Sequence, residues 1–106
     1  MNVRISDDFR TSYKRLKKRY KSLETDFESL LASLLNNPYQ GTELIDGVRK
    51  VRLAISSKRR GKSGGARVIV RIKIVPNELQ LLYIYDKSDM DNISDAFLRD
   101  VLKRME

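Results

Sequence analysis

The chain has 106 residues, a formal net charge of +8 and a hydrophobic content of 41%. This length allows one domain over residues 1–106 with a single modest core, and the periodic grouping of the hydrophobic residues excludes a disordered basic tail. Cysteine and histidine are both absent, which excludes disulfides, thiol catalysis and histidine acid–base chemistry, and we expect no metal or organic cofactor.

The first forty residues are predicted to contain a short strand and two helices. Residues 2–6 alternate as in a strand, and Ser6 is a good N-cap for a helix that runs to about Tyr20. A second helix is predicted from about Ser22 to Asn36. Both helices carry apolar residues at helical spacing, namely Phe9, Tyr13, Leu16 and Tyr20 in the first and Leu23, Phe27, Leu30, Leu31, Leu34 and Leu35 in the second. The short joint makes them an antiparallel hairpin whose apolar inner surface needs a sheet to cover it.

The second half of the chain is predicted to form a sheet and a last helix. Three strands cover residues 48–55, 65–74 and 79–87, and residues 39–47 form a loop. Short connections make the strands an antiparallel meander. A third helix covers residues 93–106 after the N-cap Ser94, and it either docks on the sheet edge or remains mobile. The expected fold class is α+β, an N-terminal helix hairpin packed on a small antiparallel sheet (β-α-α-β-β-β) with a C-terminal helix.

One segment accounts for the net positive charge of the chain. Residues 47–77 contain ten Lys or Arg and no Asp or Glu, whereas the remainder holds 12 basic and 14 acidic residues. Period-two alternation places cations and tyrosines on one sheet face: Lys50, Arg52, Arg67, Arg71, Lys73, Tyr83, Tyr85 and Lys87. It also assigns Leu82 to the helix side and Leu81 to the cationic side. Cations that neutralise phosphates beside aromatics that stack on unpaired bases favour nucleic-acid binding, and an acidic protein partner is the alternative.

A glycine-rich loop lies between two of the predicted strands. Gly61, Lys62 and Ser63 look like the end of a nucleotide-binding loop, but Ser56 stands where its first glycine would be, and a strand follows instead of a helix. We therefore interpret it as a mobile basic hairpin loop that anchors the protein on RNA phosphates. Its four charges are Lys58, Arg59, Arg60 and Lys62.

The motifs R-K-V-R-L, G-G-A-R-V-I and L-L-Y-I-Y-D-K-S within residues 49–88 resemble the RelE/ParE superfamily of bacterial type II toxins, closest to the RelE-like HigB branch. The resemblance covers essentially the whole chain. It implies a toxin that enters the ribosomal A site, cleaves mRNA there without a metal, inhibits translation and is neutralised by a cognate antitoxin. Family positions match Lys50, Arg52, Arg67 and Lys87, whereas Ser88 and Ser94 stand where an arginine and a tyrosine are found in the best-studied members.

The chemistry of RNA cleavage suggests roles for these side chains. Arg52 and Arg67 suit the stabilisation of negative charge on the phosphate, because one guanidinium group can donate two parallel hydrogen bonds to phosphate oxygens. Lys50 is crowded by Arg49 and Arg52, which favours proton exchange by its amine, and Lys87 or Tyr85 is the candidate acid. The general base stays unassigned. Residues predicted to contact RNA or the ribosome are Arg49, Lys58, Arg59, Arg60, Lys62, Arg71, Lys73 and Tyr83.

Two other functions stay open, a non-catalytic inhibitor of DNA gyrase, as the ParE-like relatives imply, and a non-toxic RNA-binding module. We expect the antitoxin to bind through an acidic or amphipathic segment that covers the basic face or displaces the C-terminal helix. The chain has no apolar run of roughly 20 residues and begins without the apolar core of a signal peptide, which favours a cytoplasmic location. Its oligomeric state stays open.

Overall fold

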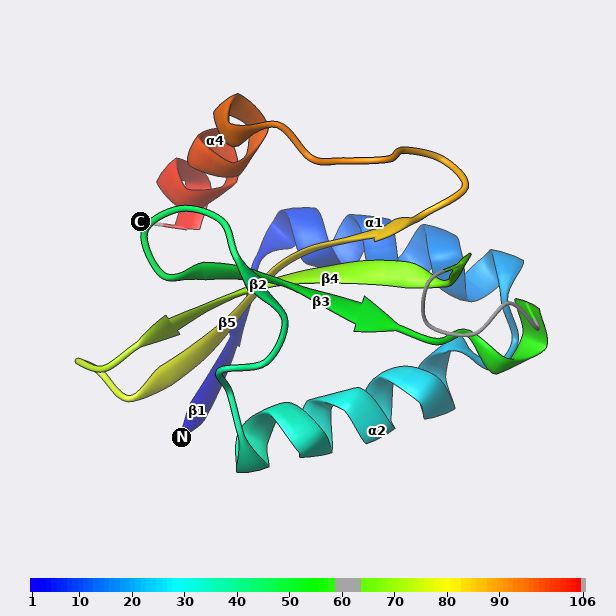
Figure 1. The fold of residues 1–106 in the computed structure, drawn as a ribbon, viewed down its shortest axis with the longest axis horizontal. Helices are drawn as coiled ribbons and strands as arrows, with labels where there is room; N and C mark the ends of the chain where they lie inside the picture. The colour runs from blue at the N-terminus through cyan, green and yellow to red at the C-terminus, as the bar shows by residue number, and fades with distance from the viewer. Residues whose placement is uncertain (59–63, 106) are drawn as a thin grey trace.

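The computed structural model describes residues 1–58 and 64–105, which form the expected α+β fold (Figure 1). In these ranges the strands of the sheet are β1 (Asn2–Ile5), β2 (Thr42–Glu43), β3 (Val48–Leu53), β4 (Ala66–Lys73) and β5 (Glu78–Asp86). The helices are α1 (Asp7–Arg19), α2 (Leu23–Asn36), the short 3-10 helix η1 (Ser56–Lys58) and α4 (Asp95–Met105). None of the described helices is long and apolar enough to cross a membrane.

The strands form one sheet in the order β1-β5-β4-β3-β2. Strands β3, β4 and β5 are the predicted antiparallel meander. Two edge strands extend it, because β1 pairs parallel to β5, and β2 pairs with β3 inside the segment that was predicted to be a loop. Gly41, just before β2, permits this pairing: its φ is 79°, and a Cβ there would lie 2.2 Å from the backbone oxygen of Lys50.

The helix hairpin covers one face of the sheet, as expected (Figure 1). Ser6 begins α1 as predicted, because its Oγ accepts a hydrogen bond from the backbone N of Phe9 at 2.9 Å. The same hydroxyl donates to the carbonyl oxygen of Leu82 in β5 at 2.6 Å and so fixes the helix to the sheet. The main core between hairpin and sheet contains Phe9, Leu16, Leu23, Phe27, Leu34, Val51, Leu53, Ile55, Ala66, Val68, Val70, Leu79, Leu81 and Ile84.

Helix α4 docks on the opposite face of the sheet and forms a second core there. This core contains Val48, Ile69, Leu82, Tyr85, Leu98, Val101, Leu102 and Met105. The helix is therefore neither mobile nor confined to the sheet edge. The expectation that the second face is cationic and solvated along its length is wrong beneath α4, where Ile69 is fully buried and Tyr85 is 4% exposed. The apolar stripe of α4 has to pack on an apolar surface, and Ile69 and the rings of Tyr83 and Tyr85 provide one.

A β-bulge in β5 corrects the predicted facing of two leucines. Ile69 pairs with Tyr83, but the next residue of β4, Val70, pairs with Leu81, so Leu82 is the extra residue. A bulge inserts one residue and breaks the period-two alternation. As a result Leu81 faces the helix hairpin and Leu82 faces α4, the reverse of the prediction.

Candidate active-site cleft

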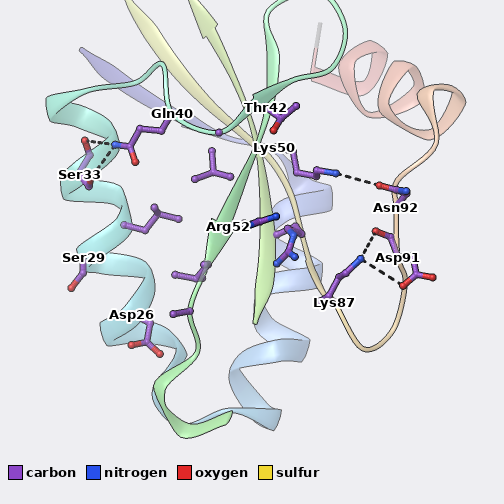
Figure 2. A pocket seen from close by; sticks show the side chains of 16 residues that line it. Asp26, Ser29, Ser33, Gln40, Thr42, Lys50, Arg52, Lys87, Asp91 and Asn92 are labelled. Atoms are coloured by element: carbon purple, nitrogen blue, oxygen red, sulfur yellow. Dashed lines mark hydrogen bonds and ion pairs between the residues drawn. The ribbon is translucent and has the colours of Figure 1, made fainter. Parts of the chain in front are cut away.

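A cleft of about 1000 Å³ extends from α2 along β3 to the segment that follows β5 (Figure 2). Four of the five residues predicted to be catalytic line it, namely Lys50, Arg52, Arg67 and Lys87. They come from β3, from β4 and from the residue after β5, so the antiparallel meander brings them together.

The wall opposite these cations is polar and belongs to α2 and the loop after it. Asp26, Ser29 and Ser33 are spaced along one face of α2 and line the cleft. Gln40 closes the end of the helix, because its Nε2 donates to the carbonyl oxygens of Ser33 at 3.0 Å and Asn37 at 2.9 Å. The cleft therefore has one cationic wall and one uncharged or acidic wall.

Two arginines face each other across the sheet at the cleft. Arg52 of β3 lies directly opposite Arg67 of β4, and Arg67 lies opposite Tyr85 of β5. Like charges in directly opposed positions destabilise a strand pair. Arg67 is 5% exposed, and its Nη1 donates to the carbonyl oxygen of Ala66 at 3.1 Å. An anion bound between the two guanidinium groups would turn their repulsion into attraction.

Both cleft lysines are held by the segment that joins β5 to α4 (Figure 2). The Nζ of Lys50 donates to Oδ1 of Asn92 at 3.2 Å. The Nζ of Lys87 donates to the backbone oxygen of Asp91 at 3.0 Å, and Oδ1 of Asp91 lies at 3.6 Å. Neither Asp91 nor Asn92 was predicted, because each sits in a segment without periodicity.

Asp26 is committed to a structural contact at the end of the cleft. Its carboxylate accepts hydrogen bonds from the backbone N and the Oγ of Ser56, at 2.8 and 2.6 Å, and from the Oγ of Ser22 at 2.8 Å. Burial alone would raise the pKa of Asp26, but these hydrogen bonds outweigh it and lower that pKa. Asp26 thus joins α2 to η1. With Asp91 it is one of two carboxylates that line the cleft beside the four cations.

Tyr85 does not line the cleft. Its ring belongs to the core beneath α4, and its hydroxyl finds no hydrogen-bond partner among the described residues. Burial raises the pKa of Tyr85, although the charge of Arg67 acts in the opposite direction. Of the two candidate acids, only Lys87 is placed in the cleft.

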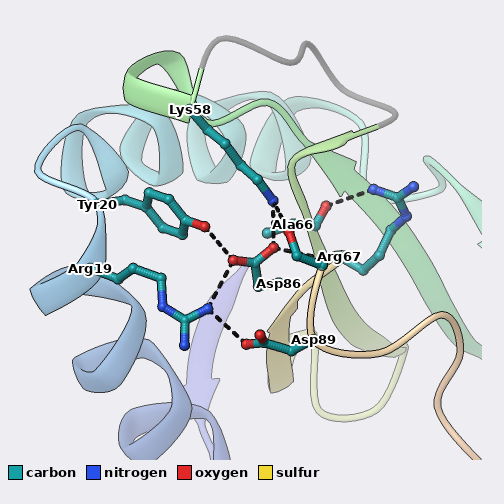
Figure 3. A network of polar contacts seen from close by, with 8 residues as sticks. Arg19, Tyr20, Lys58, Ala66, Arg67, Asp86 and Asp89 are labelled. Atoms are coloured by element: carbon teal, nitrogen blue, oxygen red, sulfur yellow. Dashed lines mark hydrogen bonds and ion pairs between the residues drawn. The ribbon is translucent and has the colours of Figure 1, made fainter.

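A buried carboxylate that sequence reasoning missed ties the end of β5 to two other elements (Figure 3). The side chain of Asp86 is fully buried and accepts hydrogen bonds from Nζ of Lys58, from the hydroxyl of Tyr20, from Nη1 of Arg19 at 3.0 Å and from the backbone N of Ser88 at 2.9 Å. Burial alone would raise the pKa of Asp86, but the bonds from Lys58, Tyr20 and Ser88 hold it well below its usual value.

This cluster changes the interpretation of Lys58. The residue was predicted on a free loop, but its side chain is only 9% exposed and pairs with Asp86. A contact with ribosomal phosphate would require this ion pair to break. The other three charges of the predicted loop, Arg59, Arg60 and Lys62, lie outside the described residues.

The remaining predicted RNA contacts lie away from the cleft lining. Arg49 donates from Nε to the carbonyl oxygen of Gln40 at 2.8 Å and thereby holds the loop after α2. Arg71 donates to the side chain of Gln80 at 2.8 Å, and Lys73 ends β4 at the far side from Arg67. Tyr83 packs edge-on against Phe97 of α4, with ring centroids 4.9 Å apart. The structure thus gathers the proposed catalytic cations but not the predicted RNA contacts.

The described part of the chain contains no cluster of three or more acidic side chains that would hold a metal ion. A comparison with known families gives a match. Residues 9–105 match the model of the family described as the RelE toxin of the RelE / RelB toxin–antitoxin system. The match extends from the first turn of α1 to the end of α4, so it includes each element that lines the cleft.

Proposed function

The chain belongs to the RelE toxin family of toxin–antitoxin systems, and on this premise we propose that it is a ribosome-dependent endoribonuclease that cleaves mRNA in the ribosomal A site and so inhibits translation. The observation that carries the proposal is the convergence of Lys50, Arg52, Arg67 and Lys87 on one cleft. A closer relation to the HigB branch stays a prediction.

The proposed reaction is metal-independent and uses the side chains of the cleft. The 2′-hydroxyl oxygen of the RNA attacks the adjacent phosphorus, and the bond from phosphorus to the 5′-oxygen breaks. Arg52 and Arg67 bind the non-bridging oxygens, whose negative charge grows in the transition state; removing one such donor typically costs about 10² to 10³ in rate. Lys50, in its neutral amine form, takes the proton of the hydroxyl and becomes an ammonium, and the ammonium of Lys87 supplies a proton to the leaving oxygen.

The cleft favours this activity over the two alternatives. Arg52 and Arg67 lie in directly opposed positions on neighbouring strands, an arrangement that suits the binding of one phosphate by two guanidinium groups. A non-catalytic gyrase inhibitor or a plain RNA-binding module needs cations on an accessible surface, but it does not need four of them in one concave site.

The test is cleavage of an mRNA on programmed ribosomes, read by primer extension. We expect cuts within the A-site codon, and we expect Arg67→Ala to lower the single-turnover rate by about 10² or more. Lys103→Ala is the control, because it removes an exposed cation that lies outside the cleft. Full activity of a folded Arg67→Ala variant would contradict the assignment. Inhibition of DNA supercoiling by gyrase with intact mRNA would favour the ParE-like alternative instead.

A further inference from the structure

A second concave surface lies on the other side of α2 from the cleft. This groove, between α1 and α2, has a volume of about 920 Å³. The two surfaces share no lining residue in the described chain. Helix α2 is their common wall: Asp26, Ser29 and Ser33 line the cleft, whereas Phe27 and Leu31 line the groove.

The floor of the groove is apolar and aromatic. The rings of Phe9, Tyr13 and Phe27 pack on one another, with centroids 5.4 to 5.7 Å apart. Ile5, which is 36% exposed, and Leu31 complete the floor. An apolar groove between two helices is a common binding site for a third, amphipathic helix.

The rims of the groove carry opposite charges. Helix α1 contributes exposed cations, namely Arg10, Lys14, Arg15, Lys17 and Lys18, and α2 contributes Glu24 and Glu28. Lys17 and Glu24 pair at 3.2 Å next to the turn that joins the helices, so the rims meet at this end. The net charge of the rims is positive, five cations against two carboxylates.

We propose that this groove docks an amphipathic helix with one acidic edge, supplied by the antitoxin that the family implies. Its apolar residues would cover the aromatic floor, and its acidic edge would face the cations of α1. The 13 residues of α1 span about 20 Å, which three to four turns of a docked helix would match. The inference rests on membership of the toxin family, and it uses the proposed cleavage activity only as one readout.

A nucleic acid fits this groove less well than a helix does. The rim cations could neutralise phosphates, but bases bind such proteins by stacking on accessible rings. Phe9 and Phe27 are only 3% and 8% exposed, so their faces are taken by the core. Aliphatic side chains of a helix can pack on their edges without displacing them.

The first test uses two synthetic helical peptides of about 14 residues, with leucines at i, i+3, i+4 and i+7. One carries Glu along one edge, and the other carries Lys at the same positions. In titrations followed by protein NMR, we expect the Glu peptide to shift amides around Phe9, Tyr13 and Leu31 and to bind at least about tenfold more tightly than the Lys peptide. Lys14→Glu/Lys18→Glu should abolish this preference.

The second test separates neutralisation from toxicity. The groove variant Lys14→Glu/Lys18→Glu and the control Lys21→Glu/Lys103→Glu make the same charge change; all four lysines are exposed, and the last two lie outside the groove. Each is co-expressed with the protein encoded by the adjoining reading frame. We expect both to cleave mRNA like the parent, and only the groove variant to escape neutralisation.

Three results would overturn the inference. These are equal neutralisation of both variants, peptide-induced shifts confined to the cleft, and tighter groove binding by a single-stranded RNA 12-mer than by the Glu peptide. Failure of the parent protein to cleave mRNA would refute the proposed activity alone, because the NMR titration does not depend on it.

Discussion

The buried carboxylate of Asp86 makes the sharpest stability prediction. Asp86→Asn keeps the shape of the side chain and removes its charge, so no cavity forms. It leaves the ammonium of Lys58, whose side chain is only 9% exposed, without a counter-charge. The new NH₂ group also points at N–H and O–H groups that donate hydrogen bonds to the carboxylate in the parent protein. Breaking a buried ion pair on one side typically costs about 3 to 5 kcal/mol. Because small domains have only about 5 to 15 kcal/mol of stability, the loss should be large.

The measurement is urea unfolding followed by circular dichroism at pH 7. We expect a lower midpoint with an unchanged slope. Asp89→Asn is the matched control, because Asp89 also pairs with Arg19 but is 52% exposed, and exposed pairs contribute about 0 to 1 kcal/mol. If Asp86→Asn lowers the free energy of unfolding by no more than Asp89→Asn does, the carboxylate does not hold these elements together.

The same cluster predicts a pH dependence. The pKa of Asp86 is lower in the folded protein than the value of about 3.9 in an unfolded chain. Its stabilisation is therefore present above that value and is lost as the pH falls through it toward the folded pKa. The difference in unfolding free energy between parent and Asp86→Asn should stay constant from pH 5 to 8 and narrow below about pH 4. A difference that widens on acidification would show that the sign of this reasoning is wrong.

Three further predictions concern the cleft and its surroundings. Tyr85→Phe removes a buried hydroxyl that has no hydrogen-bond partner among the described residues. We therefore expect unchanged or slightly higher stability in urea unfolding and an unchanged rate of RNA cleavage. A large loss of cleavage with an intact fold would instead identify the phenol as the general acid. Asp91→Asn removes a carboxylate that lies 3.6 Å from the ammonium of Lys87. The affinity for a non-cleavable RNA should therefore rise a few-fold in fluorescence titrations at low salt. An unchanged affinity would mean that the carboxylate does not compete with RNA phosphate for Lys87. Gly41→Ala places a Cβ against the backbone of Lys50 and adds strain at a positive φ, so thermal unfolding should show a loss of about 1 to 3 kcal/mol; a smaller loss would mean that β2 detaches at little cost.

Local signals explain which parts of the fold were predictable. The cap at Ser6, the helical spacing that begins at Phe9 and the alternation of β4 each act over a few residues, and the structure confirms them. The bulge at Leu82 and the docking of α4 depend on partners across the sheet. No pattern within one segment contains that information.

In the cleft, too, the residues that carry local signals were predictable and their distant partners were not. Its cations were identified by the alternation of the predicted strands and by motifs that carry the family resemblance, and the register of three strands places them together. Their partners were missed because the contacts are distant in sequence. Lys58 and Asp86 are separated by 28 residues, and Lys50 and Asn92 by 42. A single sequence without periodicity in residues 87–94 does not reveal such pairs.

The two cores on opposite faces of the sheet also imply an order in which parts of the protein unfold locally. The core beneath α4 contains eight buried residues, against fourteen in the core beneath the hairpin. Among the described residues, the polar contacts of α4 outside its core include Arg104 to Asp8 and Arg4 to the carbonyl oxygen of Met105. Amide hydrogens of α4 should therefore exchange with solvent well before those of β4 and β5. Within the described residues, a protease acting on the native protein would find cleavage sites in the segment that leads to α4, and the trimmed protein would keep its main core.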